Sequence, residues 1–297
     1  MKTPRYWLTW IGLGILWLVS LMPLPVLFYA GGLLGDLLLR LVPSRRKIAL
    51  QNLQLCFPEL SSAETDRMLR RNFQNTARMF LFSGFVWWGS RQTFEKAIRV
   101  QNAHLIDQSL SEGHGVVLLA PHFVAMEVAG LLLSTRYPGV SIYQRSKNQA
   151  LDRVMLKARS RFGGQMIERK SDMRSLIRAM RKGRPCYYLP DQDPGPKRAV
   201  FAPFFGIPTA TWPVLGRIAT LTDAEVLPCT THLLPGGAGF EIIIDPPILD
   251  FPTGEAVADC EIMNQAIENC VRRMPDQYFW VHKRFKTRPR GSPDLYP

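Results

Sequence analysis

The chain has 297 residues, of which 46% are hydrophobic and 21% are charged, so its composition is not that of a disordered protein. A chain of this length can bury a large core, as one large domain or as two small ones. The formal net charge of +13 predicts attraction to polyanions: nucleic acid, an anionic membrane face or acidic soluble proteins. The five cysteines are scattered and none forms a C-x-x-C pair. This pattern predicts reduced, mostly buried thiols and a cytoplasmic setting, and neither a zinc site nor a disulfide framework.

A long apolar stretch occupies the N-terminus. No charged residue occurs between Tyr6 and Gly35, and about 20 apolar helical residues are enough to cross a bilayer core. Pro23 and Pro25 interrupt the stretch, which predicts either a single span kinked near the prolines or a helix followed by a shallow second segment. Basic residues on both sides leave the orientation open. A cleaved signal peptide is disfavoured because no A-x-A site follows, and a buried core helix is the other alternative. We expect residues 1–44 to form a membrane anchor.

Two helices are expected after the anchor, over residues 44–60 and 61–88. The second has a suitable start at Ser62 and a suitable stop at Gly84. Its last part, F-S-G-F-V-W-W, is strongly aromatic. An aromatic cluster of this kind fits either a membrane interface or a buried core.

From about residue 100, short β-rich runs alternate with helical stretches. Such alternation predicts an α/β domain with a mostly parallel sheet flanked by helices. We expect one domain over residues 45–297, with a helical lead-in over 45–98 and an α/β core over 99–297. The expected strands cover residues 115–120, 139–144, 165–168, 185–191, 224–234 and 240–248, and the expected helices begin near 124 or cover 148–163, 171–183, 209–223 and 254–275.

A histidine and a glutamate interrupt the apolar run V-V-L-L-A-P-H-F-V-A-M-E-V-A-G-L-L-L of residues 116–133. His122 follows a strand at the edge of the sheet where ligands bind in open α/β folds. Positions five apart in one helix point about 140° away from each other, so His122 can meet Glu127 only from outside the first turn. Glu127 would then orient the imidazole, His122 would act as a general base, and the nearby helix N-terminus would offer N–H groups to an oxyanion. The alternative is a satisfied histidine and a solvent-facing glutamate.

Five further motifs follow in a recognisable order. Tyr143 and Arg145 end a strand in I-Y-Q-R-S-K-N, and Arg159 and Arg161 form an R-x-R pair on the next helix. Then come a basic helix, E-R-K-S-D-M-R-S-L-I-R-A-M-R-K-G, the stretch Y-L-P-D-Q-D-P-G-P-K-R-A-V-F-A-P-F-F-G with Asp191, and finally D-Q-Y-F-W-V-H-K-R-F-K-T-R-P-R-G. Together with H-x4-E, this series resembles the bacterial lipid A late acyltransferases, the lauroyl and myristoyl transferases of lipopolysaccharide assembly. That family lies within the lysophospholipid-acyltransferase-like superfamily.

The resemblance runs in order from about residue 30 to the C-terminus, and it implies a glycerolipid-acyltransferase-like fold. It implies an enzyme that moves a fatty acyl chain from acyl carrier protein to a hydroxyl of a lipid A precursor, with no cofactor and no metal. The enzyme would work at the cytoplasmic face of the inner membrane, in contact with its lipids. His122 would be the base and Glu127 its partner. The resemblance places substrate contacts at Tyr143, Arg145, Arg159, Arg161 and Asp191.

The D-Q-D sequence of Asp191 and Asp193 has a second interpretation. Two carboxylates at a strand end can hold a divalent metal with a sugar nucleotide, as in a metal-dependent membrane glycosyltransferase. They can equally cap the following turn, and no further acidic cluster supports a metal. Pro194 stands where the family usually has an aromatic residue, so the resemblance fixes the position of Asp193 less well than that of Asp191.

The basic residues near the expected site suit an acidic carrier protein and a phosphorylated acceptor. The alternative is a solvated helix face or attraction to anionic lipid headgroups. The stretch H-K-R-F-K-T-R-P-R could bind nucleic acid, but it lacks a recognised binding motif and accompanies a membrane anchor, so we expect no nucleic-acid partner. Two other functions stay open: an acyltransferase acting on a lysophospholipid or glycolipid, and a non-enzymatic membrane scaffold.

Overall fold

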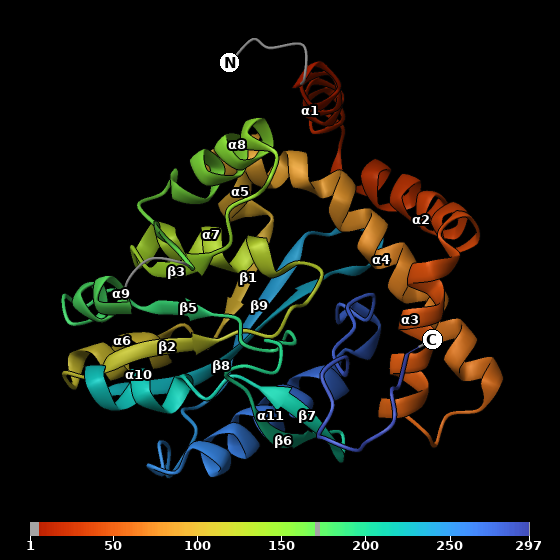
Figure 1. Cartoon of the computed structure of the whole chain (residues 1–297). Coiled ribbons are helices and arrows are strands. Elements are labelled where there is room, and N and C mark those ends of the chain that lie inside the picture. The colour runs from red at the N-terminus through yellow and green to blue at the C-terminus, as the bar shows by residue number, and fades with distance from the viewer. Residues whose placement is uncertain (1–5, 170–172, 297) are drawn as a thin grey trace.

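A seven-stranded sheet forms the centre of the fold (Figure 1). The computed structural model describes residues 6–169 and 173–296. The strand order is β1-β9-β8-β2-β5-β3-β4, and the pairing of β8 with β9 is antiparallel while the other pairs are parallel. The predicted α/β fold with a mostly parallel sheet is therefore confirmed. The strands of this sheet are β1 Ile98–Gln101, β2 Gly115–Leu119, β3 Val140–Tyr143, β4 Gln165–Glu168, β5 Cys186–Tyr188, β8 Ala224–Leu233 and β9 Phe240–Ile244.

Helices cover both faces of the sheet because its central strands are apolar on both sides. In β2, Val117 and Leu119 belong to one buried cluster and Val116 and Leu118 to another, as the two-residue repeat of a strand requires. The first cluster includes residues of α9, α10 and α11, and the second includes residues of α6 and α7. The helices are α1 Trp7–Val19, α2 Leu24–Leu41, α3 Pro43–Cys56, α4 Ser62–Trp88, α5 Arg91–Lys96, α6 His104–Ser111, α7 Met126–Arg136, α8 Gln149–Ser160, α9 Met173–Met180, α10 Leu215–Thr222 and α11 Ala256–Arg273.

The helix α4 extends beyond Gly84, the residue at which we expected it to stop. It begins with a capping box, in which Ser61 accepts from the backbone of Glu64 while the Glu64 side chain accepts from Ser61. It then continues through Gly84 to Trp88, so the expected stop at Gly84 is wrong. A Cβ on Gly84 would lie 2.5 Å from the carbonyl oxygen of Leu16 in α1. This glycine therefore serves close helix packing and not helix termination.

The expected helix over residues 209–223 is also wrong in its first part. Residues 209–211 belong to β7 Ile207–Thr211, which pairs with β6 Val200–Phe204 in a separate antiparallel hairpin. Only Leu215–Thr222 is helical. The expected helix over 171–183 is found as α9, while its first two residues lie outside the described residues.

The apolar N-terminus forms two helices, separated before Pro23. In the described part of the chain, α2 is the one helix long and apolar enough to cross a membrane, whereas α1 has only 13 residues. Both helices present large apolar side chains to the outside, including Trp7, Ile11, Tyr29 and Leu33, which is 74% exposed.

The inner face of α2 packs very closely against α4. A Cβ on Gly31 would lie 2.6 Å from the Cα of Arg78, and a Cβ on Gly35 would lie 2.4 Å from the Cα of Gln74. Small residues four apart allow two helix backbones to approach in this way. The apolar N-terminal segment is thus fastened along its small-residue face to the helical lead-in.

We expect Gly35→Leu to force α2 away from α4, because the new side chain has no space between the two backbones. Such overpacking costs about 1–3 kcal/mol. Gly14→Leu is the matched control, since a Cβ on Gly14 has nothing within 4 Å. Thermal unfolding in detergent and limited proteolysis between α2 and α3 would detect the change. Equal behaviour of the two variants would contradict this packing argument.

Candidate active site

Three neighbouring strands deliver polar side chains to one edge of the sheet. β5 lies between β2 and β3, and all three run parallel. His122 follows β2, Asp191 follows β5 and Tyr143 ends β3. Because the carboxyl ends of parallel strands meet at the same edge, residues nearly 70 positions apart in sequence come together there.

The imidazole of His122 is bonded to the buried carboxylate of Asp191. His122 Nδ1 lies 2.5 Å from Asp191 Oδ1, and the backbone N–H of His122 donates to Oδ2 at 2.8 Å. The side chain of Asp191 is 1% exposed and that of His122 is 16% exposed. A carboxylate at Nδ1 fixes the tautomer in which Nε2 carries a lone pair, so the histidine can accept a proton there.

Asp191 remains ionised despite its burial. Desolvation by itself would raise its pKa, but the charge of His122 and hydrogen bonds from His122 and Tyr278 lower the pKa to about 2. Burial raises the pKa of the Tyr278 hydroxyl well above its usual value. The tyrosine therefore stays a proton donor at neutral pH, and the carboxylate stays an acceptor.

Glu127 has other partners. In the described part of the chain it shares no hydrogen bond with His122, so the direct contact that we expected is not formed. Its carboxylate accepts from Arg159 of α8 and, at 2.9 Å, from the indole N–H of Trp87 in α4. Glu127 lies in the first turn of α7, four residues after Phe123 in the loop that carries His122. The structure thus gives two pairs, His122 with Asp191 and Glu127 with Arg159.

His122 of the first pair and both members of the second pair line one cavity of about 310 Å³. One wall is a single face of α7, where Met126, Gly130 and Leu133 recur at helical spacing, and Tyr137 at the helix C-cap extends it. The opposite wall comes from β3, β4 and β5. The lining includes the first and last residues of β3, so the cavity runs along the whole length of that strand.

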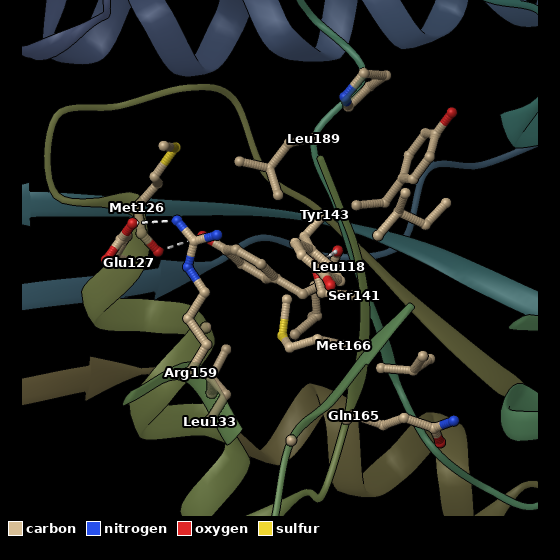
Figure 2. Close-up of a pocket in the computed structure, with 18 of the residues that line it drawn as sticks. Leu118, Met126, Glu127, Leu133, Ser141, Tyr143, Arg159, Gln165, Met166 and Leu189 are labelled. Atoms are coloured by element: carbon tan, nitrogen blue, oxygen red, sulfur yellow. Dashed lines mark hydrogen bonds and ion pairs between the residues drawn. The ribbon is translucent and has the colours of Figure 1, made fainter. Parts of the chain in front are cut away.

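The interior of this cavity is mostly apolar. Figure 2 shows Arg159 reaching to Glu127 on one side, with Leu118, Met166 and Leu189 around the space. A volume of this size lies at the low end of the roughly 300–1,000 Å³ found for small-molecule sites. A mostly apolar channel with paired charges at its border can hold a hydrocarbon chain and present one polar group to the histidine.

The other expected contact residues divide into two groups. Tyr143 and Arg159 line the cavity. Arg145 does not: its side chain is 61% exposed and lies 3.7 Å from Asp152. Arg161 is not a lining residue either. It donates to the carbonyls of Val86 and Gly89 at 2.8 and 2.6 Å, and so satisfies the C-terminal end of α4.

Asp193 has a structural task. Its Oδ1 accepts from the backbone N–H of Gly195 at 2.7 Å, which closes an Asx-turn over Pro194, and from the hydroxyl of Thr287 at 2.9 Å. Its Oδ2 accepts from the backbone N–H of Thr287 at 2.6 Å. Asp191 is engaged by His122. The two carboxylates therefore serve different partners, and this arrangement favours the turn-capping interpretation over a shared metal site.

Sequence reasoning gave no role to the C-terminal segment that supports the histidine loop. The backbone N–H of Phe279 donates to the carbonyl of His122 at 2.9 Å, and that of Val124 donates to the carbonyl of Gln277 at 2.8 Å. Asn72 of α4 donates to the carbonyl of Tyr278 at 2.6 Å. Asn52 of α3 donates to the carbonyls of Trp280 and His282 at 2.7 and 2.8 Å. The motif D-Q-Y-F-W-V-H marks this segment in the sequence, but the sequence does not show which residues the segment contacts.

Comparison with known proteins identifies the same family as the sequence motifs. The family model of the bacterial lipid A biosynthesis acyltransferases matches residues 1–287. The chain is 35% identical to the lipid A biosynthesis lauroyltransferase of Escherichia coli K12, over 99% of this chain and 96% of that protein. It is 34% identical to the palmitoleoyltransferase of the same organism, over 99% and 95%. It is 30% identical to the myristoyltransferase, over 100% and 94%.

These matches extend over nearly the whole length of both partners, as the resemblance in the sequence motifs implied. The matched region contains every residue of the two pairs and of the cavity. The chain belongs to the bacterial lipid A biosynthesis acyltransferase family, and it is an acyltransferase of lipid A biosynthesis.

Proposed function

We propose that this enzyme transfers a fatty acyl chain from the thioester of acyl carrier protein to a hydroxyl of a lipid A precursor. The observation that carries the proposal is the His122–Asp191 pair at the mouth of an apolar cavity. A hydroxyl is a poor nucleophile until a base takes its proton. The pair provides that base next to a space suited to the acyl chain.

In the proposed reaction, His122 alone takes up and returns the proton. Nε2 takes the proton of the acceptor hydroxyl as its oxygen attacks the thioester carbonyl. The tetrahedral intermediate collapses, the carbon–sulfur bond breaks, and the imidazolium returns the proton to the thiolate of the carrier. Asp191 stabilises the imidazolium between the two transfers. No covalent acyl-enzyme is needed.

Glu127 acts in this proposal through Arg159. The guanidinium lines the cavity and is held by the carboxylate of Glu127, which Trp87 fixes from the other side. A positive group oriented in this way can stabilise the developing oxyanion of the thioester. Glu127 would thus be a positioning residue for Arg159, and not the partner that orients His122.

The apolar outer faces of α1 and α2 support a place for the enzyme at the membrane surface. We place the site at the cytoplasmic face of the inner membrane, because the carrier donor is a soluble cytoplasmic protein. Residues 1–44 would then form the anchor, and residues 45–297 the catalytic domain. A lipid acceptor held in the bilayer and a soluble donor can meet only at such a surface.

The central test is an assay with the detergent-solubilised enzyme, a tetraacylated lipid A precursor and acyl carrier proteins charged with different chains. Mass spectrometry of the lipid would report a gain of one acyl chain. A gain with a lysophospholipid or a glycolipid, and none with the lipid A precursor, would overturn the proposed acceptor.

We expect His122→Ala to lower kcat by about 10²–10⁴-fold, because the general base is lost. Asp191→Asn should lower it by a similar order, since the amide can donate to Nδ1 and leave the proton on Nε2. The thermal transitions must be measured for both variants. Full activity of folded His122→Ala would remove the histidine from the mechanism.

A double-mutant cycle separates the two possible roles of Glu127. If Glu127 works through Arg159, the variant Glu127→Gln, the variant Arg159→Ala and the double variant should show similar losses of kcat, about 10-fold to 100-fold each. Residues that act as one unit are not additive. Losses that multiply in the double variant would show that Glu127 acts separately, for instance on His122 in the substrate complex.

The far end of the cavity should limit the acyl chain. Ser134 lines the cavity, and its hydroxyl donates to the carbonyl of Gly130 in its own helix. We expect Ser134→Leu to shift the preference toward shorter chains, because forcing extra methylenes into a filled space costs about 1–3 kcal/mol. Ser134→Ala is the control and should keep the wild-type preference. Competition between carriers of different chain length would measure the shift, and an equal loss for every chain would contradict this placement.

A further inference from the structure

A second, strongly basic groove lies outside the catalytic cavity. It has a volume of about 800 Å³ and runs between α9 and α10. No acidic side chain is among its described lining residues. Its cationic lining residues, all exposed, are Arg174, Arg178, Arg181, Lys182, Arg198 and Arg217.

Two of these cationic side chains, one on each wall of the groove, form no ion pair in the described part of the chain. Arg178 of α9 and Arg217 of α10 have no ion-pair partner among residues 6–169 and 173–296. Arg174 and Arg178 are four positions apart in α9, so their like charges stand one above the other on one side of the helix, and Lys182 follows in the turn after the helix. Such spacing destabilises a helix on its own. A partner of opposite charge would remove that repulsion.

The groove adjoins the cavity. Trp212 lines both spaces. Arg169, which lines the cavity, lies with its guanidinium 5.4 Å from the centre of the Trp212 ring. A molecule seated in the groove therefore lies next to the cavity that would hold the acyl chain.

The groove also lies away from the apolar helices. In Figure 1, α9 and α10 are at the left of the view, α2 is at the right, and α1 is at the top. A membrane contacted by the outer faces of α1 and α2 would leave the groove facing the aqueous phase. This position favours a soluble acidic protein over an anionic lipid surface as its occupant.

We infer that the α9–α10 groove is the docking surface for the acidic acyl carrier protein, which it holds with its thioester arm directed past Trp212 into the cavity. The inference rests on the proposed function, since it assumes the carrier-linked donor. Complementary charges of this kind steer encounter and depend on ionic strength.

The double charge reversal Arg178→Glu with Arg217→Glu tests the inference. It changes one residue on each wall of the groove and touches no described ion pair. The matched control is Lys96→Glu with Arg99→Glu, since both residues are exposed and lie at the end of α5 and in β1, the opposite edge strand of the sheet. Initial rates at low and high salt, and direct binding of the acyl carrier protein by surface plasmon resonance, would be measured for the full-length protein in detergent.

We expect the groove variant to raise KM for the carrier-linked donor by about tenfold at low salt, with kcat little changed and with weaker carrier binding. The salt dependence of its KM should be flatter than that of the wild type. The control variant should match the wild type. Transfer from acyl-pantetheine, which has the thioester arm without the protein, should be the same for all three.

Other results would overturn the inference in distinguishable ways. A wild-type enzyme that takes no acyl chain from any carrier would refute the proposed function itself. A wild type that is active, with unchanged KM and carrier binding in the groove variant, would refute the docking surface alone. If the groove variant instead loses flotation with vesicles containing an anionic phospholipid while its KM for the carrier is unchanged, the groove binds the membrane and not the carrier.

Discussion

The site depends on one constraint, a buried carboxylate that must stay ionised. Asp191 is 2% exposed, and an uncompensated charge at that depth would cost several kcal/mol. His122 stabilises this charge with two hydrogen bonds, one from its backbone N–H and one from Nδ1. Tyr278 adds a further hydrogen bond. The loops after β2 and β5 and the C-terminal segment are therefore fixed to one another by the same charge that orients the imidazole. Stability of this region and reactivity of the histidine have a common origin.

The helical lead-in takes part in that arrangement although it contributes nothing to the sheet. Asn52 and Asn72 are buried on α3 and α4, and both donate to carbonyls of residues 278–282. That segment in turn bonds the backbone on both sides of Phe123. The side-chain amides of Asn52 and Asn72 supply the hydrogen-bond donors that a neighbouring strand would otherwise supply. A buried carbonyl without a donor would cost free energy. The lead-in and the α/β core thus build the site jointly.

The local parts of this site could be predicted, and the pairings could not. The apolar run before His122 indicates a strand, and the run that begins near Val124 indicates the helix that follows. Asp191 becomes the partner of His122 only because β5 is inserted next to β2, and strand order is not contained in the spacing along the chain. The H-x4-E spacing and the family resemblance predict His122 as the partner of Glu127. Its actual partner, Arg159, comes from the next helix along the chain, and Trp87 from an earlier one. The error at residues 209–211 has the same cause, since β7 exists only through its register with β6.

The apolar N-terminal segment and the catalytic cavity both contact α8. Thr9 of α1 accepts from the side chain of Asn148 at 2.8 Å, and Asn148 caps the N-terminus of α8. Arg159 lies near the other end of that helix, where it lines the cavity and binds Glu127. A rigid helix therefore joins the apolar N-terminal segment to the charged border of the cavity. The apolar N-terminal segment and the guanidinium of the proposed oxyanion contact are in this way attached to the same helix, which is itself bonded to α7 through Glu127.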